Sequence, residues 1–142
     1  MTVLDAYAVL AYLRGETAAE EVGLLLRSLT VLSAVNAAEV IDQLVRVYDR
    51  PADDVHADLA VLSRAGMDLT PVSAEVGLLA DRLRARHYHR GRKPVSLADC
   101  VAGAIALSMG RPLATSDPPL AAMIRAEGSG VHPLPDSMGR MP

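Results

Sequence analysis

The chain contains a single cysteine, Cys100, and neither tryptophan nor phenylalanine, so its aromatic side chains are four tyrosines. One cysteine cannot form an internal disulfide and cannot supply the usual cysteine-based zinc sites. With so few aromatics, a core has to be built from aliphatic residues and methionine. Hydrophobic residues nevertheless make up 51% of the 142 residues and charged residues 22%. This composition predicts one packed domain and argues against disorder.

Long apolar runs are also missing. No run approaches the roughly 20 residues that a helix needs to cross a bilayer. The first residues, Met-Thr-Val-Leu-Asp, contain no basic segment of the kind that opens a signal peptide. We therefore expect a cytoplasmic protein without a membrane partner.

The net charge of −3 is too small to indicate a partner, but its distribution is uneven. Residues 82–93, which we call the basic strip, contain no acid and six basic residues: Arg82, Arg84, Arg86, Arg90, Arg92 and Lys93. The other eight basic residues stand against seventeen acids, which leaves a net charge of −9 outside the strip. Two interpretations are open: a solvated helix face with its loop, or a surface that contacts phosphates while tyrosine and histidine stack on bases.

Short apolar segments with strand character alternate with helical patterns along the chain. We expect strands at residues 2–4, 29–33, 67–71, 112–115 and 131–134. We expect helices at residues 6–14, 17–27, 36–50 (capped by Asn36), 51–66, 73–86, 96–110 and 117–128. This alternation predicts an α/β sandwich around a mostly parallel sheet, with the short strands at residues 2–4 and 113–114 near its centre. The domain covers residues 1–134, and residues 135–142 are expected to form a flexible tail.

Carboxylates recur where predicted strands end and helices begin. Asp5 and Asp117 follow strands, Glu39 lies one turn into the helix after the second strand, and Asp99 completes a capping-box pattern with Ser96. Ligands of open parallel sheets bind outside the carboxyl ends of the strands, so three of these acids share one rim, and Asp99 joins them if its helix starts there. Converging carboxylates repel one another, and an oxygen-preferring divalent cation would relieve that repulsion.

Each acid also has a purely structural interpretation. Asp5, Asp99 and Asp117 could serve only to begin helices. Glu39 is harder to explain in this way, because its neighbours look buried and a buried carboxylate needs a partner. The spacing of the acids alone leaves the metal site and the structural interpretation open.

At these positions the chain resembles the PIN-domain ribonucleases, and most closely the VapC-like toxins of type II toxin–antitoxin pairs. The matching segments are residues 3–6, 33–40, 96–100 and 113–117. The resemblance covers nearly the whole chain except the tail. It implies a PIN-like three-layer sandwich with a five-stranded sheet, and an endoribonuclease that depends on Mg²⁺ or Mn²⁺ and hydrolyses RNA phosphodiesters. It assigns metal ligation and catalysis to the four acids Asp5, Glu39, Asp99 and Asp117.

The resemblance also carries expectations for the surroundings of these acids. Thr115 and Asn36 would support the ligands, and the substrate RNA would contact the basic strip at Arg86, Arg90, Arg92 and Lys93. Many relatives carry a small hydroxyl residue two places after the first aspartate, where this chain has Tyr7, and we assign Tyr7 no role. A toxin implies a cognate antitoxin protein, and a partner helix or a homodimer mate could cover the leucines of the N-terminal half: Leu10, Leu13, Leu24, Leu25 and Leu44.

Other functions remain to be weighed. The chain could be a PIN-like binding module that acts through protein or RNA contacts without cleavage. A phosphatase with a strand-end aspartyl nucleophile usually needs a second aspartate two residues on, where Tyr7 stands. A dinucleotide-binding domain is excluded, because no glycine-rich turn follows the first strand. A Cys100 nucleophile is disfavoured by its buried-helix context and by the lack of a paired histidine.

Overall fold

The computed structural model describes residues 1–92 and 94–142 and contains a five-stranded sheet in the order β3-β2-β1-β4-β5. The strands are β1 (Thr2–Leu4), β2 (Thr30–Ser33), β3 (Met67–Thr70), β4 (Leu113–Thr115) and β5 (Val131–Pro133). All neighbouring strands in this sheet are parallel. Val3 of β1 pairs with Val31 on one side and with Leu113 on the other. β1 therefore lies at the centre of the sheet, as its short apolar sequence predicts.

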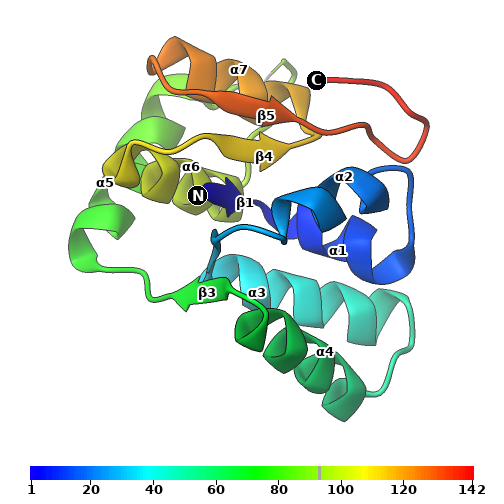
Figure 1. Cartoon of the computed structure of the whole chain (residues 1–142). Coiled ribbons are helices and arrows are strands. Elements are labelled where there is room, and N and C mark those ends of the chain that lie inside the picture. The colour runs from blue at the N-terminus through cyan, green and yellow to red at the C-terminus, as the bar shows by residue number, and fades with distance from the viewer. Residues whose placement is uncertain (93) are drawn as a thin grey trace.

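Helices cover both faces of the sheet and give the predicted three layers (Figure 1). One face carries α1 (Ala6–Arg14), α2 (Ala19–Leu25), α3 (Ala34–Asp42), the π-helix η1 (Gln43–Val47) and α4 (Ala52–Arg64). The other face carries α5 (Ala74–His87), α6 (Leu97–Met109) and α7 (Pro118–Ala126). Every expected strand and helix is present, so the predicted α/β class is confirmed.

Two buried clusters, one on each face of the sheet, make up the core. The side chains of β1 alternate between them, with Leu4 in the cluster under α1–α4 and Val3 in the cluster under α5–α7. In the second cluster, Gly103 lets α6 lie close to α7, because a Cβ there would come within 2.9 Å of Met123 Cε. This packing fixes the position of α6, whose first turn carries Asp99.

The start of α3 differs from the prediction. The helix is capped by Ser33 and not by Asn36: the Ser33 side chain accepts a hydrogen bond from the Asn36 amide at 2.9 Å. Ser33 is the last residue of β2 and has the extended backbone that a cap requires, so the helix begins directly after the strand. Asn36 is thereby placed in the first turn of the helix.

Three further helix boundaries were predicted wrongly. The helix expected at residues 36–50 is α3 followed by η1, and the segment ends where Asp49 adopts a φ of 54°. Pro51 is the N-cap of α4 and not its first helical residue. The helix expected at residues 17–27 is limited to Ala19–Leu25.

The leucines proposed as a partner surface divide between core and surface. Leu44 is completely buried, so assigning it to a partner surface was wrong. Leu24 is 54% exposed, while Leu10, Leu13 and Leu25 pack against the core and are partly buried. Within the part of the chain that the structure describes, no helix combines the length and the apolar composition of a membrane span.

After β5 the chain passes the side of α1 and α2 and then turns back toward α7 (Figure 1). The Tyr7 hydroxyl donates a hydrogen bond to the Pro135 carbonyl at 3.1 Å. Asp136 organises a turn by accepting from the amides of Met138 at 2.8 Å and Arg140 at 2.9 Å. The tail therefore has defined contacts in this conformation, and its flexibility stays a prediction.

Candidate active site

Asp5 lies at the carboxyl end of the central strand and is the N-cap of α1. Its Oδ1 accepts a hydrogen bond from the Ala8 amide at 2.8 Å, and the residue is only 4% exposed. Burial raises the pKa of Asp5 to about 7; the charges of Asp99 and Asp117 add to the rise, and a hydrogen bond from the Thr115 side chain opposes it. A carboxyl group with this pKa is only partly ionised at neutral pH, and a nearby cation would favour its charged form.

Asp117 reaches the same rim from β4, the strand beside β1. Fully buried Thr115 ends β4, and its Oγ1 accepts a hydrogen bond from the Asp117 amide at 3.0 Å. Asp117 occupies the N-cap position of α7, but its side chain makes no capping hydrogen bond of ordinary geometry. Burial and the charge of Asp99 raise the pKa of Asp117 to about 6, while the Leu120 amide opposes the shift. A capping role alone does not account for this carboxylate.

Asp99 lies in the first turn of α6, on the face of the sheet opposite to α1 and α3, and the predicted capping box is present. Asp99 Oδ2 accepts from the Ser96 amide at 2.7 Å, and the Asp99 amide donates to Ser96 Oγ at 3.0 Å. The charge of Asp99 contributes to the raised pKa of Asp5, Asp117 and Glu39 alike. Asp99 is therefore both a structural cap and a member of the acidic group.

Glu39 is half-buried one turn into α3, between the buried residues Ala37 and Val40. Burial and the charge of Asp99 raise its pKa, and a hydrogen bond with Asn36 lowers it. Ala38, which was expected to be buried, is exposed, so the surroundings of Glu39 are more open than the sequence suggests.

Asn36 connects the two helices that carry Glu39 and Asp99. Its side chain is completely buried, and its Oδ1 accepts from the Ser33 hydroxyl at 2.5 Å. Its Nδ2 donates to the Ala98 carbonyl at 3.3 Å, one residue before Asp99. Asn36 thus joins the first turn of α3 to the first turn of α6.

We call Asp5, Glu39, Asp99 and Asp117 the acidic group. Their carboxylates are oxygen ligands, and the charge of Asp99 acts on the other three. Across residues 1–92 and 94–142, no three His, Cys, Asp or Glu side chains are arranged so as to hold a metal ion. The donor type still fits a hard divalent cation such as Mg²⁺. A cation bound here would also offset the charge repulsion among these carboxylates, and it would thereby lower the raised pKa values of Asp5, Glu39 and Asp117.

Not every residue of the basic strip lies near the carboxylates. Arg86 Nη1 contacts both carboxylate oxygens of Glu127, at 2.7 and 3.0 Å, and His87 Nε2 lies 2.6 Å from Glu127 Oε1. Glu127 follows the end of α7, whereas Asp117 precedes its start, about 15 Å away at 1.5 Å per residue. The structure therefore does not bring Arg86 to the carboxylates.

Two of the remaining strip residues proposed for RNA, Arg90 and Arg92, lie in the loop between α5 and α6. Arg90 and Arg92 are exposed there, and this loop leads to α6, whose first turn contains Asp99. Lys93 lies outside the described residues.

Tyr7 is the residue beside the acids that the sequence left without a role. Burial and the charges of Asp136 and Asp5 raise its pKa. Its position two residues after Asp5 was the available sequence clue, but its contact with Pro135 links positions 128 residues apart and could not be inferred from local pattern.

Comparisons with known proteins agree with this architecture. The family model described as PIN domain matches residues 2–125. No protein with curated annotation matches the chain in a sequence search. The solved structures with similar folds include a toxin–antitoxin complex from Klebsiella pneumoniae, at 16% identity, a TM-score of 0.70 and coverage of 93% of this chain and 96% of the other.

Two further structures are similar over most of their length. VapC20 from Mycobacterium tuberculosis, described as a toxin that cleaves the sarcin-ricin loop, has 18% identity and a TM-score of 0.70, with coverage of 86% of this chain and 94% of that chain. VapBC2 from Rickettsia felis, bound to a DNA fragment from its promoter, has 14% identity and a TM-score of 0.67, with coverage of 92% and 96%. At these identities the similarity shows a shared fold.

Proposed function

The chain belongs to the PIN-domain family, and from this premise we propose that it is a metal-dependent endoribonuclease acting as the toxin of a toxin–antitoxin pair. The observation that carries the proposal is the acidic group at the carboxyl edge of the sheet, where Asp99 acts on Asp5, Asp117 and Glu39. Carboxylates gathered at this edge, with pKa values raised by burial and mutual repulsion, suit cation-assisted hydrolysis better than structural capping.

The ligands of the cation in this proposal are Asp5, Glu39, Asp99 and Asp117. PIN nucleases generally use divalent metal ions, and a bound Mg²⁺ or Mn²⁺ supplies a water of lowered pKa and neutralises charge on the reacting phosphate. Thr115 holds the Asp117 backbone and opposes protonation of Asp5. Asn36 keeps Glu39 and Asp99 on helices that are fixed to each other.

RNA has to approach a strongly negative rim, and the proposal assigns the compensating charge to the basic strip. Arg90 and Arg92, with Lys93, would contact phosphates on the approach to Asp99. Arg86, which the sequence also suggested for RNA, is already paired with Glu127, so its share in RNA binding is expected to be smaller.

The test is cleavage of a fluorescent single-stranded RNA by the purified protein with Mg²⁺, and again with EDTA. Asp5→Asn and Asp117→Asn should each lower the rate at least about a hundredfold, because each removes a charge that holds the cation. The matched control is Asp68→Asn, which changes an exposed aspartate on the edge strand β3 and should leave the rate unchanged. Equal rates for parent and Asp5→Asn would contradict the proposal.

A second candidate is a PIN-like binding module that does not cleave RNA. The observation that favours it is that the described carboxylates are not already arranged as a metal site. Two results together would support the binding module against the nuclease. The protein would bind RNA in Mg²⁺ or Mn²⁺ without cleaving it, and the parent and Asp5→Asn would bind RNA equally well.

The toxin role implies an antitoxin and is tested separately. Structures similar to this chain include toxin–antitoxin complexes. We propose that a cognate antitoxin covers the site, and that a homodimer or the antitoxin covers exposed apolar side chains such as Leu24. Expression of the chain alone should arrest growth, and co-expression of the protein encoded by the adjacent gene should relieve the arrest. Expression of Asp5→Asn should be harmless in the same cells.

A further inference from the structure

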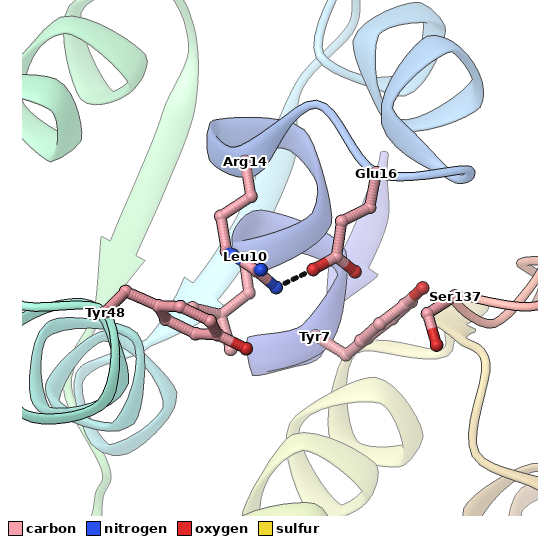
Figure 2. A pocket seen from close by; sticks show the side chains of 6 residues that line it. All are labelled: Tyr7, Leu10, Arg14, Glu16, Tyr48 and Ser137. Carbon is pink, nitrogen blue, oxygen red and sulfur yellow. Dashed lines mark ion pairs between the residues drawn. The ribbon is translucent and has the colours of Figure 1, made fainter.

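A cavity of about 390 Å³ opens beside Tyr7, two residues after Asp5. We call it the tyrosine pocket, and Figure 2 shows the side chains that line it: Tyr7, Leu10, Arg14, Glu16, Tyr48 and Ser137. Its volume falls in the range of roughly 300–1,000 Å³ that small-molecule sites occupy. None of these six residues has a part in the cation chemistry proposed above.

The tyrosine pocket runs along α1, the helix that Asp5 caps. Tyr7, Leu10 and Arg14 are spaced by three and four residues, so they share one face of this helix. The helix begins directly after its cap Asp5, and Tyr7 is its second residue. A ligand that contacts Tyr7 would therefore lie two residues along α1 from Asp5.

Planar groups from two separate elements meet in the pocket. The Arg14 guanidinium lies 3.6 Å from the centre of the Tyr48 ring. Tyr48 follows η1, and its amide donates to the Gln43 carbonyl five residues earlier at 3.2 Å. This wider π-helical turn changes the angular position of the residues that follow, and Figure 2 shows Tyr48 lying beneath Arg14. Two of the four tyrosines in the chain thus line one cavity.

The charge of the pocket argues against a phosphate as its occupant. Arg14 forms an ion pair with Glu16, which is drawn as the dashed contact in Figure 2. The carboxylate cancels the positive charge that an anion would need. Aromatic and guanidinium faces together with a carboxylate acceptor suit a neutral planar heterocycle instead.

The hydrogen-bonding capacity of the pocket distinguishes among the bases. An ionised carboxylate only accepts hydrogen bonds. Guanine presents two adjacent donors on its Watson–Crick edge, N1–H and N2–H, whereas adenine, cytosine and uracil have no two adjacent donor atoms on this edge. Both oxygens of the Glu16 carboxylate can therefore accept from guanine, whereas with each of the other bases one oxygen would face an acceptor or no partner.

We propose that the tyrosine pocket binds a guanine of single-stranded RNA next to the phosphodiester at the acidic rim. The base stacks on the ring of Tyr48, and Glu16 accepts from its Watson–Crick edge. This inference rests on the proposed ribonuclease function and names the sequence preference that the same site would have.

The experiment measures binding without catalysis. The Asp5→Asn protein in EDTA is titrated with fluorescent uridine pentamers that carry G, A or C at the central position, and with the all-uridine pentamer. The guanine pentamer should bind about tenfold more tightly than the other three. Tyr48→Ala should reduce that affinity about tenfold, which is the usual scale for removing one stacking partner of a base. Tyr48→Phe keeps the aromatic face and should retain the affinity.

Two variants separate recognition from general surface effects. Glu16→Gln replaces an acceptor-only group with one that also donates, so the ratio of guanine to adenine affinity should fall toward one. Tyr12→Ala removes an exposed tyrosine of α1, the helix of Tyr7. Tyr12 does not line the pocket, so the ratio of guanine to adenine affinity should stay at the parent value.

The outcomes distinguish this proposal from the proposed function. Equal affinity for all four pentamers would overturn the guanine site, even if the parent cleaves RNA. So would a guanine preference that survives both Tyr48→Ala and Glu16→Gln. A guanine preference in a parent that never cleaves RNA would uphold the pocket and reject the nuclease. If the two pocket variants weaken only the binding of an antitoxin, the pocket receives protein and the proposal is wrong.

Discussion

The Asn36 side chain donates a hydrogen bond to the Ala98 carbonyl at 3.3 Å, and this contact joins the helix of Glu39 to the helix of Asp99 across 62 residues of sequence. The same amide group accepts from the Ser33 hydroxyl. Because Asn36 is completely buried, its polar atoms have no water to replace these partners.

Replacing this residue should therefore affect both stability and cleavage. Asn36→Ala leaves the Ser33 hydroxyl and the Ala98 carbonyl with one partner fewer, and we expect a decrease of about 1–3 kcal/mol in the free energy of unfolding. The rate of RNA cleavage should also fall, because the direct connection between α3 and α6 is removed. Urea titration and the cleavage assay measure the two effects.

Val35→Ala is the control for this experiment, since Val35 is exposed on the same turn of α3. It should change both quantities little. An Asn36→Ala protein as stable as the Val35→Ala protein would show that the connection between the helices has no energetic weight.

The sequence was most informative where structure is decided locally. Asp5, Asp99 and Asp117 stand next to strand ends or in helix first turns, and such positions follow from a few neighbouring residues. The start of α3 was misplaced because Ser33 and Asn36 are both good caps, and only the end of β2 decides between them.

Features that depend on distant partners could not be predicted. Arg86 looked available for RNA, but its partner Glu127 is 41 residues away. The tyrosine pocket depends on Arg14 meeting Tyr48, which no periodicity in either segment indicates. The arrangement of the acids as a group was predicted from topology, whereas their ligation of a cation stays a prediction.

The raised pKa of Asp5 predicts how the metal-free protein responds to pH. Folding favours the protonated carboxyl, so stability is greatest below the ordinary carboxyl pKa of 3.8 and is lost as the pH rises toward the native value of about 7. Asp5→Asn keeps an acceptor for the Ala8 amide and removes the titration. In EDTA, thermal melts at pH 5 and pH 8 should show a smaller loss of stability for Asp5→Asn than for the parent, by on the order of a few kcal/mol. Asp68→Asn should follow the parent, and an Asp5→Asn protein that also follows the parent would contradict the prediction.

Cation binding should have the opposite dependence on pH. A cation requires ionised ligands, and the pKa values of about 7 for Asp5 and about 6 for Asp117 leave both partly protonated in mild acid. The gain in melting temperature on adding Mg²⁺ should therefore be larger at pH 8 than at pH 5.5. Asp117→Asn should reduce the gain at pH 8. A gain that is equal at both pH values, or equal in Asp117→Asn, would place the cation elsewhere.

The two interpretations of the basic strip differ in the salt dependence of RNA affinity. Removing one side chain that neutralises a phosphate should reduce the slope of log affinity against log salt by about 0.7 for single-stranded RNA. Replacing Arg90, Arg92 and Lys93 together by glutamine should lower the slope by up to about 2 if all three bind phosphates.

Arg86→Gln is the matched comparison. Glu127 already pairs with this arginine, so the slope should change less, while the link between α5 and α7 weakens. Fluorescence anisotropy between 50 and 300 mM salt measures all three proteins, with Asp5→Asn as the background to prevent cleavage. A triple variant with the parent slope would make the strip an ordinary solvated surface, because charges that bind RNA cannot be removed without releasing fewer counterions.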